Sequence, residues 1–149
     1  MPGIEAMRAA LLTLVVLAAS AAEYPLTITA ERDLVASATI AGDTVRFLID
    51  TGSNASVIDQ AYCTKHGLAT KAGRGSTTGI HGQRQGLVRL ADRLAISGVG
   101  EGWNDFLVVD LGLRNRTADQ AVVGLLGSDY LLARKAVVDL GRLVLTIPE

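Results

Sequence analysis

The apolar residues of this chain fall into short runs rich in Val, Ile, Leu, Ala and Thr, and turn residues separate the runs. The runs are 26–29, 34–40, 45–49, 87–90, 94–96, 106–109, 121–126, 136–140 and 143–147. Runs of this kind predict strands, and Ala41-Gly42-Asp43 predicts a hairpin turn between two of them. Short helices are expected only at 59–66, capped by Asp59, and at 128–134, capped by Ser128. We therefore expect an all-β, barrel-like domain with one or two short helices.

Composition limits the function classes that suit the chain. It has 149 residues, of which 49% are hydrophobic and 19% charged, and its formal net charge is −1. This is the size of one domain, with enough apolar material for a core and no basic stripe for nucleic acid. Cys63 is the only cysteine, and His66 and His81 are the only histidines. We therefore expect no disulfide within the chain, no metal site and no cofactor.

The N-terminus has the pattern of a targeting segment. Arg8 precedes an apolar run at 9–19, and small residues at 20–22 follow it before Glu23. This order predicts a signal peptide or N-terminal apolar anchor at 1–22 and a folded domain at 23–149. The run is shorter than the roughly 20 residues of a membrane-spanning helix. We expect export to the periplasm or the medium, or membrane association if the leader is not cleaved. The alternative is a buried helix.

An apolar strand that ends in a carboxylate is the first candidate for chemistry. The sequence Phe47-Leu48-Ile49 leads directly into Asp50-Thr51-Gly52-Ser53. This places a carboxyl group at the end of a rigid strand, followed by hydroxyl groups and a glycine that permits a sharp turn. Asp and Gly also favour ordinary turns after strands, so this motif alone leaves both interpretations open.

A second apolar strand ends in glycine far downstream. Leu125-Leu126-Gly127 is followed by a predicted helix that contains Asp129 and Leu131. By itself it fits a core strand with a tight turn into a helix. Together with Asp50-Thr51-Gly52, in this order, it resembles the retropepsin-like aspartic proteases, which include small bacterial members and the retroviral proteases. The resemblance covers roughly residues 26–147.

The resemblance implies a role for each matching residue. Asp50 would be the catalytic carboxylate, Thr51 would brace the partner's loop through its hydroxyl, and Gly52 would donate its N–H to the carboxylate. Ser53 would add a hydroxyl donor that favours the charged carboxylate. The family's flap would come from about 76–86, with Gly79, Ile80, His81 and Gly82 at its tip and in contact with substrate.

The chain contains one Asp-Thr-Gly, whereas this chemistry needs two carboxylates. The resemblance therefore implies a homodimeric aspartic endopeptidase in which two copies of Asp50 meet on a two-fold axis and hydrolyse a peptide bond through an activated water. The alternative of a different class is a catalytically weak or inactive peptide-binding or assembly module with the same fold. A β-domain with an ordinary Asp-Thr-Gly turn is a third interpretation.

Overall fold

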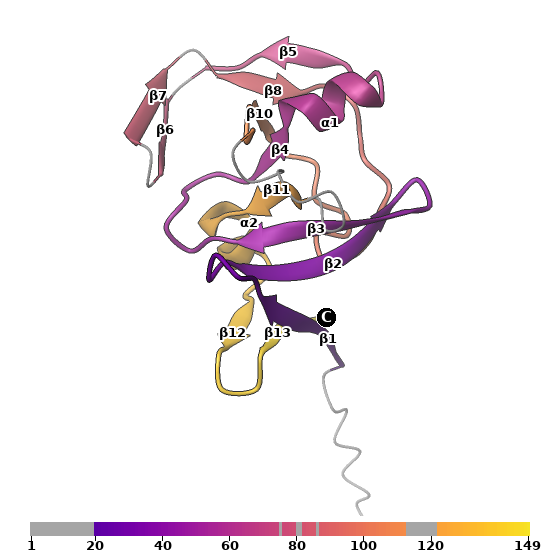
Figure 1. The fold of residues 1–149 in the computed structure, drawn as a ribbon, viewed down its shortest axis with the longest axis vertical. Helices are drawn as coiled ribbons and strands as arrows, with labels where there is room; N and C mark the ends of the chain where they lie inside the picture. The colour runs from indigo at the N-terminus through magenta and orange to yellow at the C-terminus, as the bar shows by residue number, and fades with distance from the viewer. Residues whose placement is uncertain (1–19, 75, 80–81, 86, 113–121) are drawn as a thin grey trace, which may run out of the picture.

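The computed structural model of the chain describes residues 20–74, 76–79, 82–85, 87–112 and 122–149, and strands dominate them (Figure 1). The elements are β1 (Ala21–Ile28), β2 (Leu34–Ile40), β3 (Asp43–Ile49), β4 (Val57–Asp59), α1 (Gln60–Lys65), β5 (Thr70–Ala72), β6 (Ser76–Gly79), β7 (Gly82–Gln85), β8 (Val88–Leu90), β9 (Ile96–Gly98), β10 (Leu107–Val109), β11 (Val122–Leu126), α2 (Ser128–Ala133), β12 (Val137–Asp139) and β13 (Val144–Pro148). The predicted all-β class with short helices is confirmed. The strands β4, β5, β6 and β7 were not predicted from the sequence.

Eleven strands of the described chain form one sheet in the order β12-β13-β1-β2-β3-β11-β4-β10-β8-β5, and β9 pairs with β2 outside this path. β12 and β5 are the two ends of this order. The described strands therefore form an open sheet, in the all-β class that the sequence predicts. β6 and β7 form a separate two-stranded sheet, which projects from one side of the molecule (Figure 1).

The hairpin of β2 and β3 follows from its turn residues. Ile40 pairs with Asp43, which leaves Ala41 and Gly42 as the two loop residues. Their φ angles are +52° and +90°. Positive φ at both positions is the geometry of the two-residue turn whose twist matches that of paired strands, and glycine adopts it without a steric cost. The predicted hairpin is confirmed.

β11 enters the sheet between β3 and β4, although it lies far from both in sequence. It runs parallel to β3 and antiparallel to β4. A Cβ atom on Gly124 would lie only 2.2 Å from the carbonyl oxygen of Val57, so glycine is required where the strands approach. Because parallel strands end at the same edge, this order brings the ends of Asp43–Ile49 and Val122–Leu126 together.

The core gathers large side chains from the strands, from α2 and from the segment before β10. Phe47, Phe106, Leu126 and Leu145 have no exposed surface, and Tyr130 is 1% exposed. The rings of Phe47 and Phe106 stack with centroids 5.9 Å apart. Full burial of each such side chain stabilises the fold by about 1.5–3 kcal/mol. This packing makes the end of β3 a rigid support.

The first and last described strands pair with each other. β1 pairs with β13, and Ala21 and Ala22 lie opposite Pro148 and Ile147. The predicted leader boundary after residue 22 therefore falls inside β1, while residues 1–19 of the leader lie outside the described residues. The predicted closing hairpin is confirmed, because β12 and β13 pair antiparallel. No helix in the described residues is long and apolar enough to cross a membrane.

α1 begins where its cap residue predicts. The Asp59 side chain accepts a hydrogen bond from the N–H of Tyr62, at 3.3 Å. Cys63 is buried in this helix. Burial, and secondarily the charge of Asp59, raise the pKa of the Cys63 thiol to about 11. The thiol is therefore protonated at neutral pH.

Candidate active site

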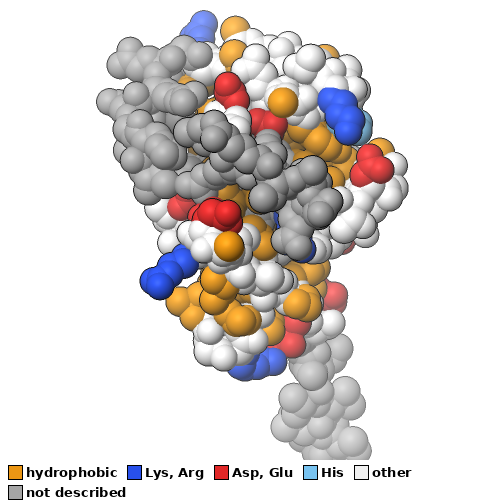
Figure 2. Space-filling view, viewed as in Figure 1, with side chains coloured by type: hydrophobic (Ala, Val, Ile, Leu, Met, Phe, Trp, Pro, Cys, Tyr) orange, Lys and Arg blue, Asp and Glu red, His pale blue; other side chains and the backbone are white. Residues whose placement is uncertain are grey.

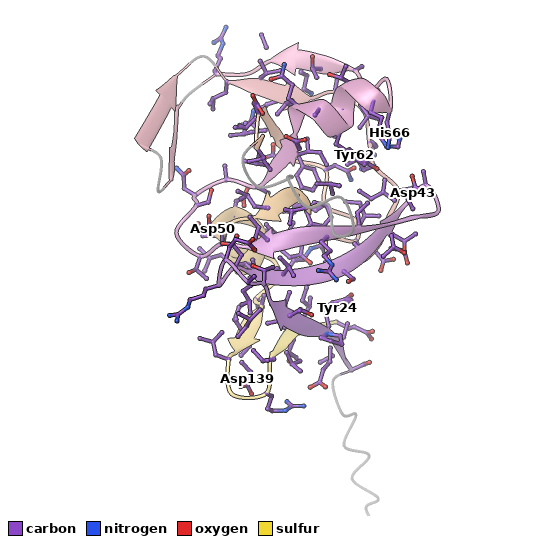
Figure 3. The ribbon with its side chains drawn as sticks, in the orientation of Figure 1. Tyr24, Asp43, Asp50, Tyr62, His66 and Asp139 are labelled. Atoms are coloured by element: carbon purple, nitrogen blue, oxygen red, sulfur yellow. The ribbon has the colours of Figure 1, made fainter. Side chains whose placement is uncertain are left out.

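Asp50 directly follows the last residue of β3, Ile49 (Figure 3). The three residues before it, 47–49, are buried, and Asp50 itself is half-buried. Its N–H donates to the carbonyl oxygen of Leu126, at 3.0 Å. The second apolar motif therefore holds the backbone of the first, as expected if the two motifs form one site.

The turn after Asp50 is closed by two hydrogen bonds. The N–H of Gly52 donates to Asp50 Oδ1, at 2.9 Å, which is the contact that the resemblance implies. The N–H of Ser53 donates to the carbonyl oxygen of Asp50, at 3.3 Å. Asp110 accepts the same kind of bond from the N–H of Gly112, at 2.8 Å. The Gly52 contact is thus ordinary turn chemistry, and the attachment to Leu126 is what distinguishes Asp50.

Ser53 does not make the contact expected of it. Its hydroxyl donates to the carbonyl oxygen of Ala55, at 2.8 Å. A serine hydroxyl has one proton to donate, so it cannot also donate to Asp50. The expectation of an added hydroxyl donor at the carboxylate is therefore wrong in this chain. Ser53 is buried and shapes the loop, whereas Thr51 and Gly52 are exposed.

Gly127 marks the point where the second motif contacts this loop. A Cβ atom on Gly127 would lie 2.7 Å from the carbonyl oxygen of Ala55 and 2.9 Å from that of Ser53. The next residue, Ser128, donates its N–H to the same Ser53 oxygen, at 2.8 Å. Because the loop leaves no room for a side chain at Gly127, only glycine fits there. Leu126 is fully buried, and Leu125 is partly exposed on the opposite face.

The predicted cap of α2 is wrong. The helix includes Ser128, and its N-cap is Gly127, which makes no side-chain cap hydrogen bond. The close approach to the loop at 53–55 determines the residue at this position, and the usual preference for a polar N-cap gives way to it.

A hydrogen-bonded pair that the sequence did not predict joins the loop to α2. Ser56 is fully buried, and its hydroxyl donates to Asp129 Oδ1, at 2.7 Å. Its N–H donates to Asp129 Oδ2, at 2.8 Å. The Ser56 hydroxyl oxygen also accepts from the N–H of Gly127, at 3.1 Å. Asp129 belonged to the motif that carried the resemblance, but no sequence signal pointed to Ser56.

The predicted flap region contains a hairpin. Ser76–Gly79 and Gly82–Gln85 pair antiparallel, with Gly79 opposite Gly82. The two glycines are therefore the last described pair of the hairpin, and Ile80 and His81 between them lie outside the described residues. In the view of Figure 3, the hairpin and Asp50 lie on the same side of the molecule. Contact between this hairpin and a substrate stays a prediction.

Among the described residues, no group of three or more His, Cys, Asp or Glu side chains is placed to hold a metal ion. The described residues of the site provide a carboxylate on a rigid strand end, a tightly held loop and a hairpin on the same side of the molecule.

Comparison with known proteins identifies the family. The model of the family described as aspartyl protease matches residues 36–130, a range that contains Asp50, the hairpin and Gly127. The match covers well over half of the chain, and the chain therefore belongs to the aspartyl protease family. This confirms the resemblance that the two motifs predicted.

The chain is also similar to a solved structure of a retropepsin-like aspartic protease from Rickettsia conorii. The two chains share 15% sequence identity, over 88% of this chain and 95% of that chain, with a TM-score of 0.48. No curated protein matches the chain.

Proposed function

We propose that the chain is an aspartic endopeptidase whose active site forms between two copies, each of which contributes Asp50. Two observations together carry the proposal: the backbone of Asp50 is held in place, and the chain has only one copy of the Asp-Thr-Gly motif. The backbone of Asp50 is bonded to Leu126, yet the sequence contains one Asp-Thr-Gly. Membership of the aspartyl protease family supports the chemistry.

The two carboxylates would have different roles in hydrolysis, one as general base and one as general acid. Like charges about 3 Å apart cannot both ionise, and the aspartic proteases are the established example of this behaviour. One carboxylate takes a proton from the attacking water, and the protonated one polarises the scissile carbonyl. Because the pair shares one proton, the acid and base roles belong to the dimer and not to one copy of Asp50.

The exposure of the catalytic turn supports contact with a second copy. Thr51 and Gly52 are exposed, although the loop that follows them is buried at Ser53 and Ser56. A two-fold axis beside Asp50 would place each Thr51 against the loop of the partner subunit. Burial of this turn would also shield the two carboxylates and their shared proton from bulk solvent.

Apolar residues outside the core offer further area for such a contact. Leu132 is 78% exposed, Val137 58% and Leu140 66%. They lie on α2, β12 and the turn after β12, and Figure 2 shows apolar side chains gathered over this lower part of the molecule. β12 is also an end strand of the sheet, so its outer edge is available for pairing with another strand.

The substrate would bind as an extended strand between the catalytic turn and the β6–β7 hairpin, held mainly through its backbone. The proposed contacts of the hairpin are the tip residues Gly79, Ile80, His81 and Gly82. Gly79 and Gly82 have no side chains, which would let the tip approach a peptide backbone closely.

We also propose that the segment at 1–22 directs export. Processing after residue 22 would remove two residues of β1, but Glu23, Tyr24 and Pro25 would keep their pairing with β13. The domain would therefore keep its terminal sheet. N-terminal sequencing of protein recovered from the periplasm or medium tests this, and an intact leader on all recovered protein would contradict cleavage.

Cleavage of a denatured protein mixture between pH 3 and 7 tests the catalytic assignment. Asp50→Asn should abolish cleavage, because amide side chains cannot share the proton. Asp110→Asn is the matched control, since Asp110 makes the same turn contact and, among the described residues, has no backbone bond like that of Asp50 to Leu126. Equal loss in both variants, or activity in Asp50→Asn, would contradict the assignment. Peptide binding without cleavage by the unmodified chain would favour the binding-module alternative.

A further inference from the structure

A pocket lies between the loop that follows Asp50 and the base of the β6–β7 hairpin. Asn54 and Ala55 line it from the loop, and Arg74 and Leu87 line it from the two sides of the hairpin base. The other lining residues are Arg89, Asp105, Leu107 and Asp129. Its volume is about 200 Å³. Pockets for small-molecule ligands usually measure about 300–1,000 Å³, so this one suits a single side chain.

Three of the four charged side chains in this pocket are already paired. Arg89 forms an ion pair with Asp105. Asp129 accepts hydrogen bonds from Ser56 Oγ, at 2.7 Å, from the N–H of Ser56, at 2.8 Å, and from the N–H of Tyr130, at 2.7 Å. The charges of Arg89 and Asp105 therefore offset each other, and both oxygens of Asp129 are occupied by hydrogen bonds from neutral donors.

Arg74 is different. It is exposed, and it makes no ion pair or hydrogen bond with the residues that the structure describes. Its guanidinium has five N–H donors and a fixed positive charge, which suits a carboxylate. The apolar side chains of Leu87 and Leu107 also line the pocket and would pack against the methylene groups of a Glu side chain.

The distance along the chain limits which substrate residue can reach this pocket. Asn54 follows Asp50 by four residues, so their Cα atoms lie at most about 14 Å apart. An extended peptide advances about 3.3 Å per residue. The pocket therefore lies within about four substrate residues of the scissile bond.

We infer that this pocket is a specificity site that receives an acidic substrate side chain, with Arg74 as its recognition residue. The inference rests on the proposed function, because it places a peptide beside Asp50. In a two-fold dimer the pocket occurs twice, so acidic residues are selected on both sides of the scissile bond. Arg74 acts on substrate choice and takes no part in the chemistry.

Binding of extended fluorescent peptides to the Asp50→Asn chain tests the inference without cleavage. The peptides form matched sets with Glu, Gln or Lys at each position within four residues of the centre. We expect Glu peptides to bind about fivefold more tightly than Gln peptides at the selected position, as for a well-placed exposed charge pair. The difference should shrink at high ionic strength.

Substitutions at Arg74 test whether this residue causes the preference for Glu over Gln peptides. Adding Arg74→Gln should remove the difference between Glu and Gln peptides, and adding Arg74→Glu should favour the Lys peptide. Arg93→Gln is the matched control, because Arg93 is exposed and does not line the pocket. It should leave the preference unchanged.

Equal binding of Glu and Gln peptides at every position would overturn the inference, as would a preference that survives Arg74→Gln. Failure to bind any peptide would overturn both the inference and the proposed function. A preference for Glu that depends on Arg74, in a chain whose unmodified form cleaves nothing, would overturn the protease proposal alone.

Discussion

The carboxylate of Asp129 holds Ser56, 73 residues away in the sequence, through both the hydroxyl and the backbone N–H of that serine. Because Ser56 follows the turn at Asp50 and Asp129 lies in the first turn of α2, this pair joins the two predicted motifs through side chains. The bond from the Asp50 N–H to the Leu126 carbonyl oxygen joins them through the backbone.

Substitution of Asp129 by Asn should destabilise the fold. An amide has one oxygen, whereas all three bonds to Asp129 need an acceptor, so a donor would face a donor. We expect a loss of about 1–3 kcal/mol in the free energy of unfolding, measured by urea denaturation. Asp105→Asn is the control, because the Asp105 side chain is 62% exposed and its ion pair with Arg89 should be worth less than about 1 kcal/mol. Equal losses in the two variants would contradict this account.

Substitution of Gly127 by Ala should also destabilise the chain, since the new Cβ atom would lie 2.7 Å from the Ala55 carbonyl oxygen. Overpacking of this kind costs about 1–3 kcal/mol, and the shift of the loop should lower proteolytic activity as well. Gly141→Ala is the matched control, because its nearest contact is the flexible Asp139 side chain, at 3.3 Å. If Gly127→Ala unfolds at the same urea concentration as the unmodified chain, the tight loop contact is wrong.

Ser53→Ala should change stability but leave the pH profile of activity where it is. The hydroxyl bonds the carbonyl oxygen of Ala55 and not Asp50. Its loss should cost about 1 kcal/mol in the free energy of unfolding. Activity measured from pH 3 to 7 should keep its optimum. A displaced optimum would show that the hydroxyl reaches the carboxylate after all.

Stability should fall at alkaline pH because of Cys63. Its pKa is about 11 in the folded chain, against 9.0 for an ordinary thiol. Between these values the unfolded state holds fewer protons than the folded state, so the free energy of unfolding decreases as the pH rises above about 9. Urea denaturation from pH 8 to 11 checks this, with Cys63→Ala as the control that should lose this part of the pH dependence. An identical pH dependence in both proteins would contradict it.

Features coded by neighbouring residues could be predicted from the sequence. The turn at Ala41 and Gly42, the cap at Asp59 and the strand that ends at Asp50 each follow from local propensity or apolar pattern. The position of Asp50 beside Leu126 could be expected only from the resemblance, because a strand from late in the chain has to enter between β3 and β4.

Contacts between distant residues account for what was missed. Ser56 has no local signal, since its partner is Asp129. Ala21 and Ala22 have the small side chains of a cleavage site, yet they are strand residues because β13 pairs with them. Serine is a residue type favoured at N-caps, but Ser128 is the first residue of α2 and Gly127 is its N-cap. The helix therefore begins one residue earlier than a Ser128 cap would predict, where Gly127 packs against Ala55.

The most direct test of the central claim is the activity of mixtures of unmodified and Asp50→Asn chains, equilibrated so that subunits exchange. If each active site needs Asp50 from both subunits, random pairing in an equal mixture leaves about one quarter of the dimers with both carboxylates. The account predicts that activity falls with the square of the unmodified fraction. A linear fall, to about one half in the equal mixture, would contradict a shared active site.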